Sequence, residues 1–398
     1  MHLPAWPNRK SEKIVQVDPP WQTPRTAYVH IPFCAHHCGY CDFAVVTGQA
    51  HRQALYLEAL EAELSASLRQ PTPVAMRFLG GGTPTLLEPA QLLQLGQILD
   101  RWLPLRPDHQ SVEFSIESTP DTLDADRVAA LADIGVTRVS MGVQSFHAAA
   151  LAALDRRHDA ASIAPAIARV QARIPRLSID LIYGIPGQSL ADWQTDVQTA
   201  LDLGVSHLST YGLTYEKGTP LWKQRERGQV QPLDEDTELA QYEWAIDFLT
   251  AHGWDHYEMS NFAQPGQRCR HNEVYWANHA YFGFGVGAAR YVAGKRELNT
   301  RSLADYLRKC LAGESPTFQS EELSPDERAR ETLAVQLRRC EGIHRESFHA
   351  QTGVPLDSLL PESHQPLVDA GFLAHTPTHF AITRQGRRLA DWLVERLL

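Results

Sequence analysis

Six short apolar runs constrain the fold of the first half of this chain more than any other feature of the sequence. They are rich in strand-forming residues and are bounded by Gly, Pro or polar residues, as β-strands are. The runs cover residues 27–31, 76–79, 112–116, 138–143, 177–182 and 207–213. Amphipathic stretches lie between them, and the first carries four leucines on one helical stripe: Leu57, Leu60, Leu64 and Leu68. Repeated strand–helix units of this kind predict a parallel sheet, either open and doubly wound or closed part-way into a barrel.

The position of the polar residues favours the partial barrel. Residues that carry chemistry lie at, or just past, the carboxyl ends of the predicted strands: Cys34, Gly81, Gly82, Glu117, Gln144 and Asp180. In barrel-type α/β proteins the functional site gathers at this edge of the strands. We therefore predict an α/β fold with a partial (β/α)6 barrel of the TIM type and a site at its carboxyl edge.

The pattern changes after residue 214. Segment 216–231 is polar and predicts a connecting loop, while a helix at 236–252 and a strand at 255–259 would extend the sheet. Segment 266–291 is aromatic and glycine-rich, which predicts a binding loop more than a regular element. From residue 302 the chain is helical again, and runs at 372–373 and 380–382 predict the short strands of a wing.

These changes divide the chain into four predicted parts: an N-terminal extension at 1–25, the barrel at 26–215, a sheet extension with the binding loop at 216–300, and a mostly helical, winged domain at 301–398. A winged helix invites a DNA-binding interpretation. The net charge of −10 and the lack of a basic recognition helix argue against nucleic acid as a partner. We expect the last part to be an interaction or lid domain.

The composition indicates the compartment. The 398-residue chain has no apolar run long enough to span a membrane and no signal-peptide core at its N-terminus. Its six cysteines, three clustered and three scattered, do not make a disulfide framework. We therefore expect a cytoplasmic protein in which the cysteine cluster does metal or redox work.

The clustered cysteines are Cys34, Cys38 and Cys41, with the spacing C-x3-C-x2-C. Four thiolates would close a metal site, whereas three leave one coordination position for a group that is not protein. A loop this tight can wrap a cubane iron–sulfur cluster, with each thiolate on one iron. Zinc, held with one of the histidines at positions 30, 36 and 37, is an alternative, and a structural role for the cysteines is another. Zinc sites usually pair C-x2-C knuckles on two segments, and a second knuckle is missing here.

Other rim residues suit a cofactor that carries an amino acid and a nucleoside. The glycines of segment 80–84 let backbone approach a ligand closely, although a tight strand-to-helix turn would use them too. Glu117, Gln144, Arg156 and Asp180 offer an acid, an amide, a base and a second acid. Such groups can grip an amino-acid moiety and ribose hydroxyls, and each taken singly fits a surface or capping role equally well.

Taken together and in order, these segments resemble the radical S-adenosylmethionine superfamily, and within it the oxygen-independent coproporphyrinogen III oxidase-like family. The resemblance rests on segment 28–34, the cysteine loop, Gly-Gly-Gly-Thr-Pro-Thr, Glu117, segment 140–145 and segment 180–184. It implies a [4Fe-4S] cluster on the three clustered cysteines and S-adenosylmethionine on the open iron, cleaved by one electron to a 5′-deoxyadenosyl radical. It also implies that the following residues line the S-adenosylmethionine pocket: Tyr28, Tyr40, Gly81, Gly82, Thr83, Glu117, Gln144, Arg156 and Asp180.

Two features select a branch of that family. The oxidases carry Cys-x-Cys at the end of the loop, whereas here Cys41 is followed by Asp42 and Phe43, an ending that resembles the HemW-type haem chaperones. His-Asn-x-x-Tyr-Trp at 271–276 resembles their haem-binding motif. The resemblance implies that His271 contacts iron while Tyr275 and Trp276 offer flat faces to the macrocycle.

The motif has competing interpretations. A packed aromatic loop with a hydrogen-bonded histidine would give the same letters, and Cys269 is an alternative iron ligand. Ala289 stands where the chaperones often have a histidine, so a second axial ligand would come from elsewhere or the position would stay open.

The sequence thus predicts a haem chaperone that takes up haem as cargo and passes it to an acceptor protein. A protein reductant is a further expected partner, and no motif identifies either protein. The alternative is an oxygen-independent coproporphyrinogen III oxidase, followed by a radical enzyme acting on another substrate and by a zinc protein.

Overall fold

The computed structural model of the chain describes residues 19–106 and 112–398. Most of the expected N-terminal extension, residues 1–18, lies outside the described residues. Within them, nine strands form one large sheet with the order β11-β1-β4-β5-β6-β7-β8-β10-β9. The six strands predicted from the sequence make its centre, all parallel, with ends within two residues of the expected ones: β1 Thr26–Ile31, β4 Met76–Gly81, β5 Glu113–Ser118, β6 Arg138–Gln144, β7 Arg176–Tyr183 and β8 His207–Gly212.

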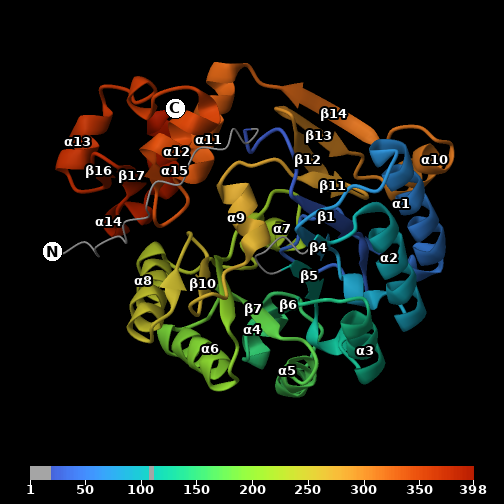
Figure 1. Ribbon diagram of the computed structural model, residues 1–398. Helices are drawn as coiled ribbons and strands as arrows, with labels where there is room; N and C mark the ends of the chain where they lie inside the picture. Colours follow the sequence, from blue (N-terminus) through green and yellow to red (C-terminus); the bar gives the residue numbers. More distant parts are fainter. Residues whose placement is uncertain (1–18, 107–111) are drawn as a thin grey trace.

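The central strands follow each other along the sheet in chain order, which confirms the partial-barrel interpretation. A doubly wound sheet would reverse its strand order part-way and place helices on both faces. Here the connecting helices lie around the outside of the curved sheet, as Figure 1 shows for α1, α2, α3, α5 and α6. These helices have the following bounds: α1 Gln53–Leu68, α2 Pro89–Trp102, α3 Ala125–Asp133, α4 Ala148–Ala153, α5 Ile163–Gln171 and α6 Leu190–Asp202.

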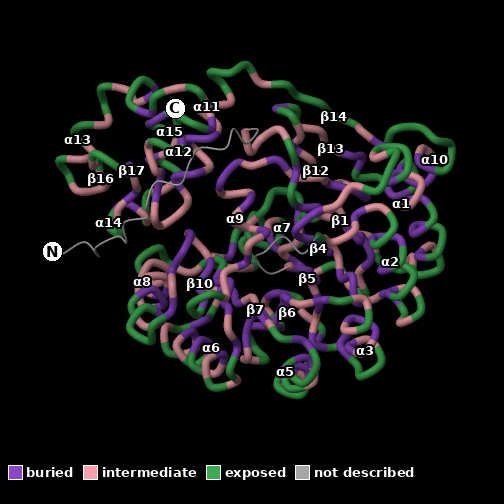
Figure 2. Tube along the Cα trace, in the orientation of Figure 1, coloured by how far each residue is buried: buried purple, intermediate pink, exposed green. Residues whose placement is uncertain are grey.

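Burial explains why these strands could be predicted from the sequence. All seven residues of β6 are buried, and the buried trace in Figure 2 follows the strands while the outward parts of the helices are exposed. Parallel strands covered on both faces are near-continuous apolar runs rather than alternating ones. The leucine stripe of α1 is buried at Leu57, Leu60 and Leu64 against the same core.

The sheet is extended at both edges. After β8 come α7 (Pro220–Glu226) and α8 (Glu235–Ala251), then β9 (Asp255–His256) and β10 (Asn261–Ala263). Strand β10 pairs antiparallel with β8, so the single strand expected at 255–259 is instead two short ones. The prediction of a plain connecting loop at 216–231 was wrong because it overlooked a helix start, in which the Thr219 side chain caps α7 and Pro220 occupies its first turn.

The prediction of an irregular loop at 266–291 was also wrong. This segment contains α9 (Arg270–Trp276), β11 (Phe282–Phe284) and the start of β12 (Ala289–Val292). Strand β11 pairs in parallel with β1 and makes the other edge of the sheet. The glycines that weakened the strand pattern are required by packing, since a Cβ on Gly283 would lie 1.8 Å from the carbonyl oxygen of Ala289.

A small antiparallel sheet of β12, β13 (Lys295–Asn299) and β14 (Thr317–Glu322) follows, with α10 (Leu303–Leu311) packed on α1. The buried carboxylate of Glu63 in α1 joins these parts. It accepts hydrogen bonds from the Gly285 amide at 2.8 Å, the Asn299 side chain at 2.7 Å and the Tyr306 hydroxyl at 2.6 Å. A single buried acid on the first helix thus ties the late elements to the barrel.

The C-terminal region has a core of its own, which includes Leu333, Phe348, Phe380 and Leu393. The wing strands are present as β16 and β17, with β15 beside them. This region lies next to α9, at the upper left of Figure 1. Its elements are α11 Pro325–Gln336, β15 Ile343–His344, α12 Arg345–Thr352, α13 His364–Asp369, β16 Leu373–His375, β17 His379–Ile382, α14 Arg384–Arg387 and α15 Ala390–Leu397. In the part of the chain that the structure describes, no helix has the length and apolarity needed to cross a membrane.

Candidate functional site

The cysteine loop lies at the carboxyl end of β1. It is framed by a short parallel pair, β2 (Phe33–Cys34) and β3 (Val46–Thr47). The Gly39 amide donates to the carbonyl oxygen of Leu154 at 3.3 Å, and the Gly39 carbonyl accepts from the Leu221 amide at 2.8 Å. The loop is therefore anchored to the chain after α4 and to the start of α7. All six cysteines of the chain are free, and the three of the loop are partly exposed.

Across residues 19–106 and 112–398, no three His, Cys, Asp or Glu side chains converge as the ligands of one metal ion do. Zinc ligands all lie about 2.0–2.3 Å from one atom, whereas the thiolates of a cubane each bind a different iron and stand further apart. The candidate zinc histidines also have other contacts: His36 lies 2.9 Å from Asp155, and His37 and His30 bond to backbone carbonyls.

The thiols have polar neighbours that the rim residues provide. The Thr83 hydroxyl donates to the sulfur of Cys34 at 3.8 Å, and an Arg156 Nη donates to the sulfur of Cys38 at 3.4 Å. Burial raises the pKa of Cys34 to about 11, so a thiolate at this position needs a metal or a cation beside it. The donor set therefore fits a group that brings positive charge to the three sulfurs.

Arg156 has an unused donor. Its Nη2 donates to the Gly142 carbonyl at 2.6 Å, but its Nε is buried without a hydrogen-bond partner among the described residues. A buried unpaired donor is rare in native structures and commonly marks an unfilled ligand position. Gln144, which is buried with a left-handed φ of 69°, has its side-chain amide nitrogen close to Gly142, on the same strand end.

Two half-buried acids lie at this edge, on strands β5 and β7, which are separated by β6. Glu117 accepts from the Gly81 amide at 2.8 Å, and Asp180 accepts from the Ser140 hydroxyl at 3.2 Å. Burial raises the pKa of Glu117 to about 7, a rise that the Gly81 amide opposes and the Asp180 charge reinforces. Near neutral pH the Glu117 carboxyl can therefore hold or release a proton at little cost.

The glycines after β4 are packed against the protein itself. A Cβ on Gly81, where φ is 110°, would lie 2.3 Å from the His30 ring, and one on Gly82 would lie 2.7 Å from the Phe33 carbonyl oxygen. A Cβ on Gly80 would touch the Glu117 carboxylate. Close packing against the protein itself therefore requires glycine at these positions, and it brings the Gly81 amide to Glu117.

A cavity of about 200 Å³ opens at this edge. Three of the residues expected at the S-adenosylmethionine pocket line it: Tyr28, Gly81 and Glu117. Phe43 and Arg301 line it too, and sequence reasoning gave neither a role in a cofactor pocket. The Arg301 guanidinium donates to the Asp42 carbonyl from 259 residues away, so no local pattern could have indicated it.

The predicted haem-binding motif lies at the opposite end of the barrel, on α9. The buried Glu113, at the amino end of β5, accepts from the Arg270 and His271 amides, each at 3.1 Å. This carboxylate satisfies the free N–H groups at the start of α9 and holds the helix against the amino ends of the strands.

His271 is fully engaged there. Its Nδ1 lies 2.6 Å from the Thr26 hydroxyl, its Nε2 lies 2.8 Å from the Tyr275 hydroxyl, and its ring stacks on Phe78 at 4.7 Å. The side chain is 1% exposed, and burial lowers its pKa to about 3, helped by the charge of Arg138. Neither ring nitrogen is open to iron in this conformation. This is the arrangement predicted by the alternative interpretation, a packed aromatic segment with a hydrogen-bonded histidine.

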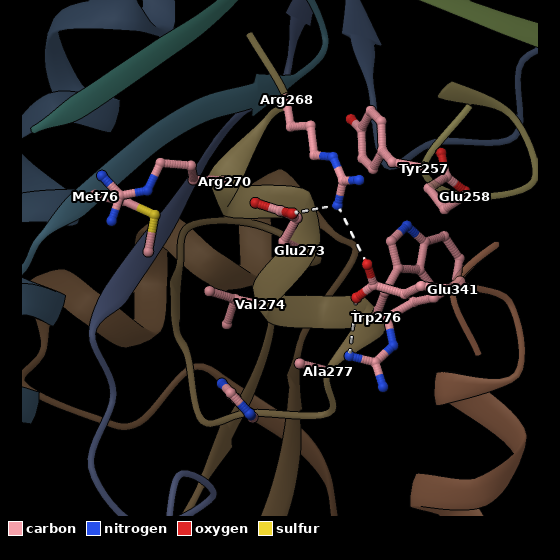
Figure 3. Close-up of a pocket in the computed structure, with 12 residues that line it drawn as sticks. Met76, Tyr257, Glu258, Arg268, Arg270, Glu273, Val274, Trp276, Ala277 and Glu341 are labelled. Carbon is pink, nitrogen blue, oxygen red and sulfur yellow. Dashed lines mark hydrogen bonds and ion pairs between the residues drawn. The ribbon is translucent and has the colours of Figure 1, made fainter. Parts of the chain in front are cut away.

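A second cavity, of about 240 Å³, lies beside α9 where the helix meets the C-terminal region (Figure 3). Val274 and Trp276 line it from α9, and Ala277 lines it from just past the end of the helix, whereas His271 and Tyr275 do not line it. In Figure 3 the Arg268 side chain extends across the top of the cavity toward Glu273 and Glu341, to which it is paired at 3.3 and 3.5 Å.

Comparisons with known proteins give the relationship. Residues 28–200 match the family model described as Radical SAM superfamily, and residues 323–389 match that of the HemN C-terminal domain. The protein named heme chaperone HemW from Bacillus subtilis (strain 168) is 33% identical over 370 residues, which span 92% of this chain and 97% of that protein. The protein of the same name from Escherichia coli K12 is 32% identical over 388 residues, which span 94% and 98%.

The chain belongs to the HemW family of radical SAM proteins.

Two further relatives place this HemW-family chain more broadly. A Danio rerio protein named radical S-adenosyl methionine domain-containing protein 1, mitochondrial, is 30% identical over 341 residues, which span 82% of this chain and 76% of that protein. The solved structure of coproporphyrinogen III oxidase HemN from Escherichia coli covers 95% of this chain with a TM-score of 0.82 at 24% identity. That likeness shows a shared fold.

The family also bears on the cofactors. Membership of the radical SAM superfamily implies a [4Fe-4S] cluster and S-adenosylmethionine, and the thiols and the unpaired Arg156 donor suit such groups. In this HemW-family chain the carboxyl edge therefore holds the residues that fit the cofactors, while the motif helix lies at the amino edge.

Proposed function

We propose that this chain is a haem chaperone, which binds haem and transfers it to an acceptor protein. The relationship to proteins named heme chaperone HemW carries the proposal, because the best-covered of these matches runs along nearly the whole of both chains. The Cys41-Asp42-Phe43 ending supports it, since the extra cysteine of the oxidases is absent.

In this proposal Cys34, Cys38 and Cys41 hold a [4Fe-4S] cluster, whose open iron binds S-adenosylmethionine. When bound, the pair supplies one-electron chemistry on the sulfonium of that cofactor. The chain's own residues orient and shield it. The Nε–H of Arg156 would donate to an anionic or carbonyl oxygen, and the carboxyl of Glu117, with a pKa of about 7, would bind a donor group.

The remaining pocket residues would complete this binding site. Gln144 and Asp180 lie on the next two strands, and Tyr40 packs behind the cysteine loop with Leu154 and Leu221. Phe43 and Arg301 would cover the mouth of the cavity and keep water from the cluster. We propose a cytoplasmic location, with a haem-acceptor protein and a protein reductant as partners.

A haem titration tests the function. Protein reconstituted anaerobically with iron and sulfide is titrated with haemin and followed through the Soret band, and the same sample is assayed for decarboxylation of coproporphyrinogen III. We expect tight, saturable haem binding and no decarboxylation. Decarboxylation without haem binding would favour the oxidase function over the chaperone function. If the protein neither binds haem nor decarboxylates the substrate, both functions are refuted.

Transfer is tested in a second step. Haem-loaded protein is mixed with apo-forms of haem proteins, and the spectrum of each acceptor is followed. We expect haem to move to at least one acceptor faster than free haemin binds it, because a chaperone delivers its cargo through a specific contact.

A further inference from the structure

We propose that the open edge of strand β14 is a docking site for a partner protein, which adds an extended segment with basic residues to the sheet. Strand β14 pairs with β13 on one side, and in residues 19–106 and 112–398 no strand pairs with its other side. In Figure 1 it is the outermost strand of the small sheet. The inference concerns this outer surface and stands apart from haem binding.

The edge is open to solvent. All residues of β14 after Thr317 are exposed, and none of them is proline. Successive backbone groups of a strand point alternately to its two sides, so an edge strand carries a row of N–H and C=O groups without strand partners. Such a row accepts one more strand through main-chain hydrogen bonds. Strand β14 therefore offers these bonds to an extended segment of another protein.

Phe318 provides an apolar anchor at one end of this edge. It is 76% exposed, the largest exposed fraction among the large apolar residues in the described part of the chain. The register of β13 and β14 shifts at this point: Leu298 pairs with Gln319 and Asn299 pairs with Thr317, which leaves Phe318 as the extra residue of a β-bulge. A bulge re-aims the side chain that it carries. The ring is thus available to an apolar side chain of a partner.

Two glutamates at the other end of the edge favour a basic partner. Glu321 and Glu322 are exposed, and neither has an ion pair within residues 19–106 and 112–398. The bases opposite them on β13, Arg296 and Lys295, are each paired with another acid. The charges of both glutamates therefore remain available, and lysine or arginine side chains on an added strand would complement them.

A second copy of this chain fits the edge poorly. An antiparallel pair of two β14 strands in full register would place each Phe318 opposite a Glu321, so that neither the apolar anchor nor the charge is matched. The glutamates thus disfavour self-pairing while they attract a basic segment. Charged residues on natural sheet edges give specificity in this way.

The matching segment has a defined pattern. Antiparallel pairing is slightly more stable per residue than parallel pairing. In an antiparallel partner the residues opposite Glu322 and Glu321 come first, and the residue opposite Phe318 comes last. The expected order is therefore two basic residues, two residues of any type and one apolar residue. Strand-forming residues such as threonine suit the middle positions.

A synthetic peptide tests the site on the full-length protein. The probe is fluorescein-labelled Thr-Lys-Lys-Thr-Thr-Val-Thr, and its control has glutamate in place of both lysines. Fluorescence anisotropy at low salt should give a Kd below about 1 mM for the lysine peptide and binding at least roughly tenfold weaker for the glutamate peptide. Two N-methylated lysine peptides, one for each set of alternate residues, test the main-chain bonds. Only the form whose methyl groups face β14 should lose binding.

Variants at the edge and a matched control locate the peptide. They are Phe318→Ala, the double reversal Glu321→Lys with Glu322→Lys, and a control double reversal, Glu346→Lys with Glu362→Lys, at exposed positions of the C-terminal region. The edge reversal should make the glutamate peptide the tighter ligand, and Phe318→Ala should weaken the lysine peptide roughly fivefold through lost apolar contact. The control reversal should match the wild type.

Hydrogen exchange of the full-length protein tests the other occupants of the edge. In the free protein the outward amides of β14 should exchange quickly, and the lysine peptide should protect them. Protection already present without peptide would overturn the inference. If that protection rises with protein concentration, the edge belongs to a second copy; if it does not, the edge belongs to a segment of the same chain. Absence of lysine-peptide binding, equal binding of the two N-methylated forms, or an unchanged preference after the edge reversal would also refute the site.

Discussion

The two ends of the barrel use buried polar groups in opposite ways. At the amino end, Glu113 accepts two backbone amides of α9, and His271 has a partner for each ring nitrogen. At the carboxyl end, Arg156 keeps an unpaired Nε and the three loop thiols are partly exposed. Since buried polar groups are nearly always paired, the fully paired His271 belongs to a structural joint, whereas the unpaired Nε of Arg156 marks a position for a ligand.

The comparison also separates two kinds of histidine. The motif residue His271, which looks functional in the sequence, is part of the joint. His279, eight residues later, carries no signal in the sequence, but it lines a cavity and has no hydrogen bond to its ring nitrogens among residues 19–106 and 112–398. Exposure and hydrogen-bond satisfaction distinguish them, and neither property can be read from the letters of the motif.

The largest effect should follow from removing one loop thiol. Cys38→Ala should lower the iron content after reconstitution from about four atoms per chain to nearly none, because three thiolates are the fewest that hold a cubane with one open iron. Cys269→Ala, at the amino end beside Glu113, should leave the iron content unchanged. Iron analysis and visible absorption measure the cluster content of both variants. Equal iron loss in the two would contradict the assignment of the cluster to the carboxyl end alone.

The next largest effect should be on stability at the amino end. Glu113→Ala leaves two α9 amides without their acceptor and removes a negative charge near the buried Arg138, which should cost about 3–5 kcal/mol in the free energy of unfolding. Chemical denaturation measures it. Glu113→Gln, which keeps one acceptor oxygen, should cost less. The folded fraction of either variant should still bind its cluster. Loss of the cluster would show that cluster binding at the carboxyl end depends on the contacts at the amino end.

Glu117→Gln tests the carboxyl end through pH. Burial raises the pKa of Glu117 from 4.5 to about 7, so its stabilising effect is complete below pH 4.5 and is lost as the pH rises through 7. Without S-adenosylmethionine, the variant should match the wild type at low pH and exceed it at pH 8 by up to about 3 kcal/mol. Thermal unfolding across this range measures the difference. Glu58→Gln on the exposed face of α1 is the control, and a pH-independent difference for Glu117→Gln would contradict the argument.

The smallest effect should come from Arg301→Ala. This change removes one hydrogen bond to the Asp42 carbonyl, worth about 1 kcal/mol, which is roughly a fivefold loss of affinity for S-adenosylmethionine. Equilibrium binding to the reconstituted protein measures it. Arg308→Ala, at an exposed position on α10, should change nothing, and an equal loss in both variants would remove Arg301 from the pocket.

Much of the fold could be predicted because its signals are local. The six central strands are buried on both faces, so they are apolar runs whose ends lie within two residues of the expected ones. Helix α8 was expected at 236–252 and runs from Glu235 to Ala251. The short strand β11 could not be predicted, because three residues with a central glycine form a strand only when β1 is there to pair with them.

The candidate site divides in the same way. The cysteine loop, the strand-end acids and the glycine run are contiguous motifs, and the sequence by itself determined their chemistry and their common edge, since parallel strands bring their carboxyl ends together. Only the tertiary structure decided that α9 packs at the amino end of the barrel and that both ring nitrogens of His271 bond to Thr26 and Tyr275. It also decided that the Arg301 side chain donates to the Asp42 carbonyl. The physical reason is that side-chain chemistry is local to the chain, whereas burial and hydrogen-bond partners are supplied by residues far away in it.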